Sequence, residues 1–325
     1  MQQNTLIRIV TLVITVVLVV LLLSQVSLEE VAFAILSIHP VYLAGGFVLY
    51  LCTYILRSLR FSLLLNRTIR IRDLLPITAV HVMMNNLLPA RTGELSYVYL
   101  LKKMHQRSTG EGVATLVVAR IFDFIMIILL LFGAGLFISD IPQAISELLW
   151  LVYILLFCLL AFLIALVSSG WFCMRLVQRV LTYFRWDTTR GGDYLLRKGM
   201  ETVESFDRID IRLNAIPILF LSCLLWLCNF GALYLIVAGM GISLPFQTIL
   251  FGGTFLLLAS VLPIHGVAGF GTTEAIWTLI YVPLGMSVNE AIISGFGYHI
   301  VLLVYTIIIG GSGSLLLRSH PFGRE

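Results

Sequence analysis

Apolar residues of this chain occur in long runs that short polar segments separate. Several runs exceed the roughly 18–20 residues that an α-helix needs to cross a bilayer. The first run follows Arg8 and lacks a small-x-small cleavage site, which indicates an uncleaved helix rather than a signal peptide. We therefore expect about six full transmembrane helices, over residues 8–26, 41–65, 111–138, 147–168, 215–240 and 290–317.

Two further apolar stretches, residues 81–94 and 261–274, are interrupted by prolines, glycines and polar side chains. Broken backbone and polar groups at membrane depth persist only where protein or water surrounds them. The limbs around each break, within 73–101 and 246–284, are short for a span. We expect two re-entrant helical hairpins, the first entered from the cytoplasm and the second from outside. For the first stretch, two short tilted helices that cross fully are the alternative.

Composition and charge support a membrane class. The chain has 325 residues, of which 59% are hydrophobic and 12% are charged, whereas soluble domains are about 25% charged. All 21 lysines and arginines fall in segments that this topology places inside or at the inner ends of helices, and the external segments carry acids. This bias predicts a multi-pass protein of the inner (cytoplasmic) cell membrane with cytoplasmic amino and carboxyl termini. It also explains the net charge of +4 without a nucleic-acid partner.

The segments also indicate a duplication. We expect a single all-α membrane domain over residues 1–325, with a first repeat at about 41–138 and a second at about 215–317. The hairpins enter from opposite faces, which predicts inverted repeats, a common transporter plan. Residues 170–214 interleave arginines with aromatic residues, a pattern typical of an amphipathic connector at the inner leaflet.

Three motifs resemble a known family. They are Asn-Asn-Leu-Leu-Pro-Ala-Arg-Thr-Gly-Glu at 85–94, Arg120-x-x-Asp123, and Leu-Pro-x-x-Gly-x-x-Gly-x-Gly-x-x-Glu at 262–274. In this order they resemble the lysylphosphatidylglycerol synthase transmembrane-region family, which includes the flippase domain of the bacterial multiple peptide resistance factor. The resemblance implies re-entrant helices and a role in moving or handling a lipid. The sequence ends at Glu325 without that factor's soluble synthase domain, so we expect no lysyl transfer.

The first and third of these motifs each contain a glutamate, Glu94 and Glu274, that opens a new segment after a turn. An embedded carboxylate in this place is a candidate for binding a proton or cation. The alternative is helix capping, with the acid in the first turn. Pro89 and Gly93 shape the first turn, and Pro263, Gly266, Gly269 and Gly271 shape the second.

The cations and amides near the first motif predict a headgroup site. Arg57, Arg60 and Arg91 have the planar guanidinium that suits phosphate oxygens. For Arg57 and Arg60, snorkelling to the interface is the alternative. Asn85 and Asn86 either donate to headgroup oxygens or tie the hairpin to its neighbours.

Three further charged or titratable residues are candidates for the substrate-binding site. Arg120 and Asp123, at i and i+3, form either a structural ion pair or a moving gate. His265 is a headgroup-contact candidate at the outer mouth, with a structural role as the alternative. The five cysteines form no Cys-x-x-Cys pair, so we expect no metal and no cofactor.

We expect a flippase or transporter that moves an anionic phospholipid or a polyprenyl-linked lipid between leaflets, and not an enzyme. Two alternatives stay open, a membrane-embedded lipid-modifying transferase and an accessory subunit of a lipid synthase. The expected partners are membrane lipids. A homodimer and a separate lipid synthase are further partner hypotheses.

Overall fold

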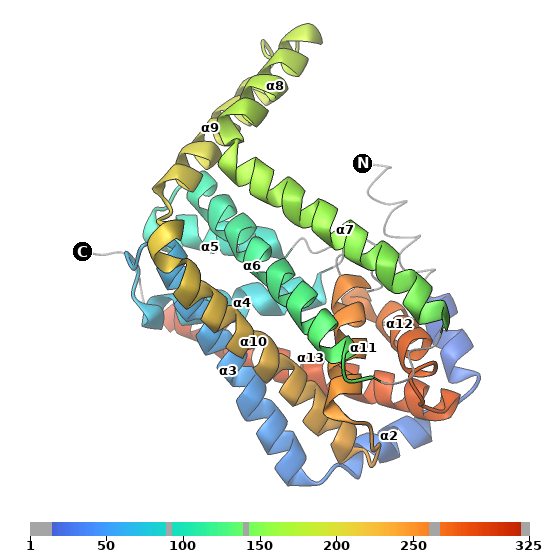
Figure 1. Ribbon diagram of the computed structural model, residues 1–325. Coiled ribbons are helices and arrows are strands. Elements are labelled where there is room, and N and C mark those ends of the chain that lie inside the picture. Colours follow the sequence, from blue (N-terminus) through green and yellow to red (C-terminus); the bar gives the residue numbers. More distant parts are fainter. Residues whose placement is uncertain (1–14, 89–92, 139–142, 260–266, 320–325) are drawn as a thin grey trace.

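The computed structural model describes residues 15–88, 93–138, 143–259 and 267–319, and every regular element within these ranges is a helix (Figure 1). The helices that are long and apolar enough to cross a membrane match the last five predicted spans to within a few residues. The all-helical, multi-pass membrane class is therefore confirmed. These helices are α3 (Pro40–Leu64), α6 (Thr109–Gly135), α7 (Gln143–Ser168), α10 (Ile211–Gly239) and α13 (Val288–Ser319).

The amino-terminal segment differs from the expected single helix through Val26. Helical residues Thr15–Leu23 are followed by α2 (Leu28–Leu36), and the two are bent by 83° at the break. Ser27 starts α2 through a capping box, in which its side chain accepts from the Glu30 N–H at 3.1 Å and its N–H donates to the Glu30 carboxylate at 2.7 Å. These reciprocal bonds satisfy backbone groups at the new helix start and so favour the turn.

Each interrupted stretch forms a pair of helices whose limbs pack on each other. The first pair is α4 (Ile71–Leu87) and α5 (Glu94–His105). The second is α11 (Phe246–Ala259) and α12 (Thr272–Tyr281), with the short 3-10 helix η2 (Val267–Gly269) before α12. The turns at 89–92 and 260–266 lie outside the described residues. The entry of these pairs into the membrane remains a prediction.

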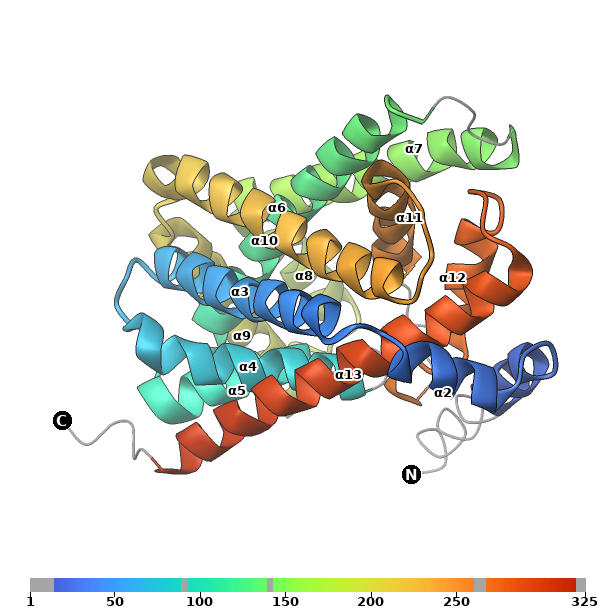
Figure 2. The ribbon, with the colours of Figure 1, turned by 90° about the horizontal axis from the view of Figure 1, so that it is seen from below.

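The long helices and the helix pairs form one packed bundle. Helices α3 and α10 lie side by side, and α13 runs along α4 (Figure 2). The main core cluster draws aromatic and aliphatic side chains from α3, α6, α10, α11, α12 and α13. Helix α11 packs against α6, and α12 against α13. Both helix pairs are thereby held against the long helices.

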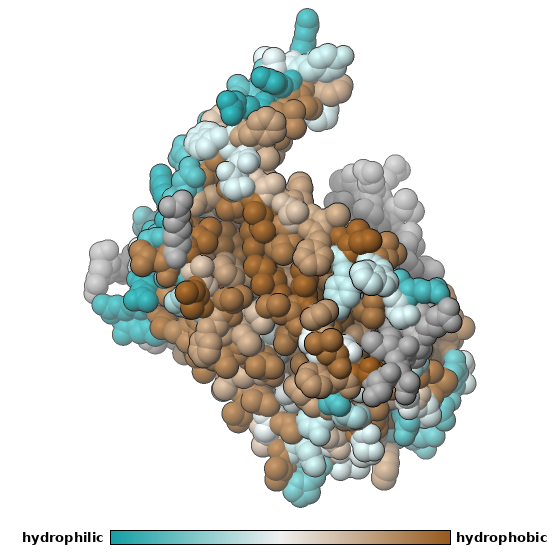
Figure 3. Space-filling model, viewed as in Figure 1, coloured by the Kyte–Doolittle hydropathy of each residue, from teal (hydrophilic) through white to brown (hydrophobic). Residues whose placement is uncertain are grey.

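The polar connector forms α8 (Gly170–Tyr183) and α9 (Arg190–Arg208), which pack on each other and extend from one end of the bundle (Figure 1). Figure 3 shows hydrophilic residues on this projection and hydrophobic residues over α6, α7 and α10. Helix α9 also packs against α6, where the Gly110 N–H donates to Glu201 Oε1 at 3.0 Å. Glu201 thus links the connector to the start of α6.

The link through Glu201 predicts a pH-dependent contribution to stability. Burial raises the pKa of Glu201, but hydrogen bonds from Lys198 and the Gly110 N–H outweigh it and lower the pKa from 4.5 to about 2. A depressed folded-state pKa stabilises the protein above pH 4.5, and this contribution is lost as the pH falls towards 2.

We expect Glu201→Gln to lower the melting temperature of the detergent-solubilised protein by about 2 °C at pH 7 and by less at pH 3. Equal melting temperatures at pH 7 would show that this carboxylate does not stabilise the junction.

Candidate functional site

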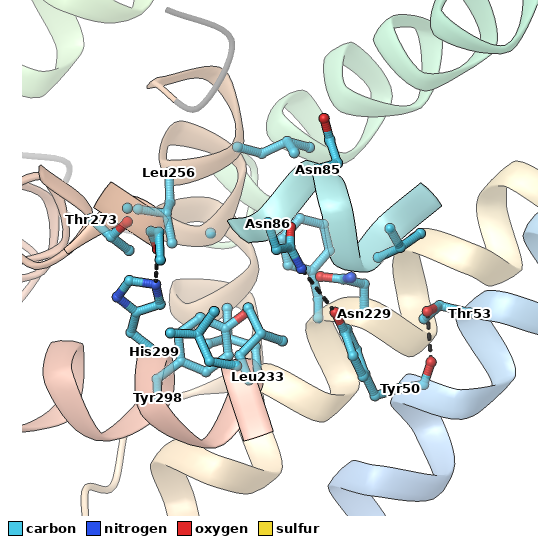
Figure 4. A pocket seen from close by; sticks show the side chains of 18 of the residues that line it. Tyr50, Thr53, Asn85, Asn86, Asn229, Leu233, Leu256, Thr273, Tyr298 and His299 are labelled. Atoms are coloured by element: carbon cyan, nitrogen blue, oxygen red, sulfur yellow. Dashed lines mark hydrogen bonds between the residues drawn. The ribbon is translucent and has the colours of Figure 1, made fainter. Parts of the chain in front are cut away.

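A cavity of about 240 Å³, here called the central pocket, lies where both helix pairs meet the long helices. Figure 4 shows Tyr50 and Asn86 on one side and Thr273 and His299 on the other. The wall combines apolar side chains with many hydrogen-bonding groups. The lining residues with hydrogen-bonding side chains are Tyr50, Thr53, Arg57, Asn85, Asn86, Arg120, Trp226, Asn229, Thr272, Thr273, Tyr298 and His299.

A buried ion pair lies beside the pocket and joins three helices. Arg60 of α3 is 1% exposed and donates to Asp123 of α6 at 2.6 Å and to Ser222 of α10 at 3.0 Å. The indole N–H of Trp226 donates to the same carboxylate at 3.1 Å. Paired and hydrogen-bonded charges are tolerated in an apolar interior, whereas an isolated charge is not.

These contacts show where Arg60 lies. Its guanidinium is buried against Asp123 and is not among the residues that line the pocket. Its contact with a headgroup stays a prediction. The predicted pair of Arg120 with Asp123 is present at 3.7 Å, but the closest cation to Asp123 is Arg60.

Arg57 lies one helical turn before Arg60 and lines the pocket. Within the described part of the chain it makes no hydrogen bond or ion pair, and its Nε is buried without a partner. The i, i+3 spacing places both arginines on one side of α3. Pairing of Arg60 with Asp123 therefore leaves Arg57 as the α3 cation that faces the pocket.

Glu94 and Arg120 form a second ion pair, between the start of α5 and α6. Arg120 lines the pocket and Glu94 lies behind it. The N-cap of α5, Gly93, makes no side-chain cap hydrogen bond. The Glu94 carboxylate thus pairs with a base on the next long helix.

A similar contact occurs in the second half of the chain. Glu274, in the first turn of α12, is fully buried, and its Oε1 lies 2.6 Å from Nδ1 of His299 on α13. His299 lines the pocket, and its Nε2 lies 3.0 Å from the Ala268 carbonyl oxygen. As in α5, the N-cap of α12 has no side-chain cap bond. Both motif glutamates therefore pair with a base that faces the pocket.

The two asparagines of α4 also face the pocket. Asn86 donates to Thr306 at 3.1 Å and to Tyr50 at 3.4 Å. These bonds tie α4 to α3 and α13. Asn85 lines the pocket, and its side-chain oxygen has no hydrogen-bond partner among the described residues. The amides therefore divide between tying the helices together and supplying polar groups to the pocket.

Glycines allow the close approaches near the motifs. A Cβ on Gly93 would lie 2.2 Å from the backbone nitrogen of Asn85, so only glycine lets the start of α5 meet α4. Gly269 and Gly271 have φ of +83° and +78°, in the left-handed region that favours glycine. Gly269 lines the pocket, whereas Gly271 approaches Leu18 of the amino-terminal helix.

The structure brings together Arg57, Asn85, Asn86, Arg120 and Gly269 in the pocket wall, with Glu94, Asp123 and Glu274 behind it. The predictions for other turn residues lie outside the described residues. These are Pro89, Arg91, Pro263, His265 and Gly266.

Sequence reasoning did not identify His299, Tyr50 or Asn229, all of which line the pocket. A histidine inside the apolar run of α13 was a detectable signal, because ionisable residues within spans are commonly functional. Within the described residues, no group of three or more His, Cys, Asp or Glu side chains is arranged to hold a metal ion.

Comparison with known sequences assigns the family. The profile of the lysylphosphatidylglycerol synthase TM region matches residues 8–310. The chain belongs to this family. A UPF0104 membrane protein of Methanocaldococcus jannaschii is 28% identical over 230 residues, which cover 69% of this chain and 86% of that protein. No solved structure matches the chain.

The buried Arg60–Asp123 pair predicts that two Asp→Asn substitutions will differ greatly in their effect on the melting temperature. Asp123→Asn removes the carboxylate that neutralises Arg60, and breaking a buried pair costs about 3–5 kcal/mol. Asp193→Asn is the control, since its pair with Arg197 is 55% and 70% exposed and exposed pairs contribute about 0–1 kcal/mol. We expect a much lower melting temperature for the first variant and little change for the second. Similar melting temperatures would contradict the structural role of Asp123.

The close contact between α4 and α5 is tested by comparing two Gly→Ala substitutions. Gly93→Ala places a methyl group against α4 backbone, which cannot move aside as a side chain could. Gly133→Ala on α6 meets nothing within 4 Å. We expect Gly93→Ala to reduce the folded yield and melting temperature and Gly133→Ala to leave both unchanged. A fully stable Gly93→Ala protein would show that the two limbs are farther apart.

Proposed function

We propose that this protein is a lipid flippase that moves an anionic phospholipid or a polyprenyl-linked lipid between leaflets through the central pocket. The observation that carries the proposal is Arg57. It is a cation in an apolar bundle, faces the pocket, and has no ion-pair partner within the described residues. The Nε of Arg57 is buried without a hydrogen-bond partner, and an uncompensated charge in an apolar interior is unfavourable, so an anionic headgroup would complete the site.

The balance of charges around the pocket also favours an anionic ligand. Arg57, Arg60 and Arg120 are accompanied by two nearby carboxylates, Glu94 and Asp123. One positive charge therefore remains in excess among these five groups. Asn85 and Asn229 add amide groups to the wall beside it. A guanidinium with neighbouring hydrogen-bond donors matches the oxygens of a phosphate.

The packing of the helices supports an inverted-repeat arrangement in this proposal. If α3, α4, α5 and α6 are exchanged for α10, α11, α12 and α13, the helix contacts are preserved. The contacts α3–α4, α4–α5 and α5–α6 correspond to α10–α11, α11–α12 and α12–α13. The cross contact α4–α13 corresponds to α11–α6, and the central contact α3–α10 maps onto itself.

The acid–base pairs follow the same exchange. Glu94 at the start of α5 pairs with Arg120 on α6, and Glu274 at the start of α12 pairs with His299 on α13. Both pairs present their base to one pocket between the two halves. Transporters with inverted repeats and interrupted helices commonly bind substrate at such a junction. In the proposed mechanism, the helix pairs are re-entrant hairpins that expose the pocket to each leaflet in turn.

Leaflet exchange in proteoliposomes tests this proposal. Labelled phosphatidylglycerol, a labelled polyprenyl phosphate and labelled zwitterionic phosphatidylcholine would be assayed separately. We expect the wild type to move at least one of the two anionic lipids faster than phosphatidylcholine, and Arg57→Gln to slow that exchange by about tenfold or more, because one charge-assisted contact is lost. Arg72→Gln, at a cation whose side chain is 74% exposed, is the matched control and should exchange as the wild type does.

Two results would contradict the proposal. The first is a folded wild type that moves neither anionic lipid under any ion gradient. The second is an Arg57→Gln variant that moves the lipid as fast as the wild type.

A further inference from the structure

The Glu274–His299 pair has a property that the Glu94–Arg120 pair lacks. Arginine stays protonated in proteins, so the first pair has a fixed charge state. Histidine and glutamate both exchange protons. The second pair is 5% and 0% exposed at His299 and Glu274, and it borders the pocket through the histidine ring.

The two contacts of His299 require a proton to be held between the pair. The Ala268 carbonyl can only accept, so Nε2 must carry hydrogen in the contact at 3.0 Å. The contact of Nδ1 with Glu274 at 2.6 Å needs another hydrogen, either on Nδ1 or on the carboxyl group. Both bonds therefore form only when the pair holds one proton more than a neutral imidazole beside an ionised carboxylate.

Loss of that proton would break one of the two bonds. A neutral imidazole has a single N–H, which can reach Glu274 or Ala268 but not both. Ala268 has φ of +50°, a conformation that non-glycine residues rarely adopt. The histidine bond therefore helps to hold a strained turn directly before α12. Deprotonation removes either this support or the neutralisation of Glu274.

Few other charged or titratable side chains surround the Glu274–His299 pair. The other charged or titratable side chains lining the pocket are Tyr50 and Arg57 of α3, Arg120 of α6 and Tyr298 of α13. The described lining residues of α4, α10, α11, η2 and α12 are not titratable. Helix α2 packs on α13 through Val31 and Ile35. The Phe270 ring contacts the imidazole in a tilted arrangement, with 4.7 Å between the ring centroids.

Deprotonation would give the pair a net charge of −1 close to the pocket. An anion in the pocket would be repelled by that charge, and it would be accepted when the pair is neutral. Binding of the anion and binding of the proton then favour each other, and linkage makes this effect reciprocal.

We infer that Glu274 and His299 form a proton-binding site of the transporter, so that the anionic headgroup and one proton occupy the central pocket together. This inference rests on the proposed function, and it identifies the proton as the coupling ion. The Glu94–Arg120 pair occupies the corresponding position in the other half of the chain, and its charge state does not change.

The site predicts an unusual effect of Glu274→Gln. The side chain of glutamine can donate to Nδ1 of a neutral His299 while Nε2 donates to Ala268, so both bonds form without a titratable proton. The variant should behave at every pH like the protonated wild type. It should bind the anion well, but without dependence on pH.

The test uses the full chain in nanodiscs of zwitterionic lipid and a short-chain phosphatidylglycerol as probe. This phosphodiester keeps one negative charge between about pH 5.5 and 8.5, so its own titration does not contribute. We expect the wild-type affinity to fall as the pH rises, by at most about tenfold per pH unit for one linked proton. Glu274→Gln should vary by less than about twofold over the range.

His39→Asn is the matched control, because it removes an exposed histidine at the N-cap of α3 and retains a capping side chain. It should show the wild-type pH dependence. Binding by the wild type that does not change with pH would overturn this inference and leave the proposed function standing. The same holds if Glu274→Gln is as pH-dependent as the wild type. A folded wild type that binds neither this probe nor a short-chain polyprenyl phosphate at any pH would overturn both.

Discussion

The ion pair between Arg60 and Asp123 is the contact on which the rest of the site depends. It joins α3 and α6, and Ser222 and Trp226 add α10 to the same network. Charges in an apolar bundle must be paired and hydrogen-bonded, so this network fixes how the three helices face one another. One turn away on α3 and on α6, Arg57 and Arg120 are thereby directed to the central pocket.

The fold was largely predictable because membrane helices are specified by apolar length and by the distribution of basic residues. The five spans from α3 to α13 follow from these signals alone. The bend before α2 was not predicted, because it depends on the local capping bonds of Ser27 and Glu30 within a largely apolar segment. Whether α4–α5 and α11–α12 are re-entrant depends on the position of the bilayer, which the packing of the chain does not define.

The site was predictable in its motifs but not in its pairings. Spacing along α6 indicated a pair of Arg120 with Asp123, because sequence separation shows only neighbours on one helix. The closest partner of Asp123 comes instead from α3, 63 residues away in the chain. Likewise the partner of Glu274 is His299, which no motif contains. Contacts between distant helices depend on tertiary packing and have no local pattern in the sequence.

The central claim is that an anionic headgroup occupies the pocket beside Arg57. The most direct measurement is a pair of experimental structures of the full chain in nanodiscs, one containing phosphatidylglycerol and one containing a polyprenyl phosphate. The account predicts a phosphate within hydrogen-bonding distance of the Arg57 guanidinium in at least one of them. Phosphates found only around the outside of the bundle in both structures, with Arg57 still unpaired, would contradict it.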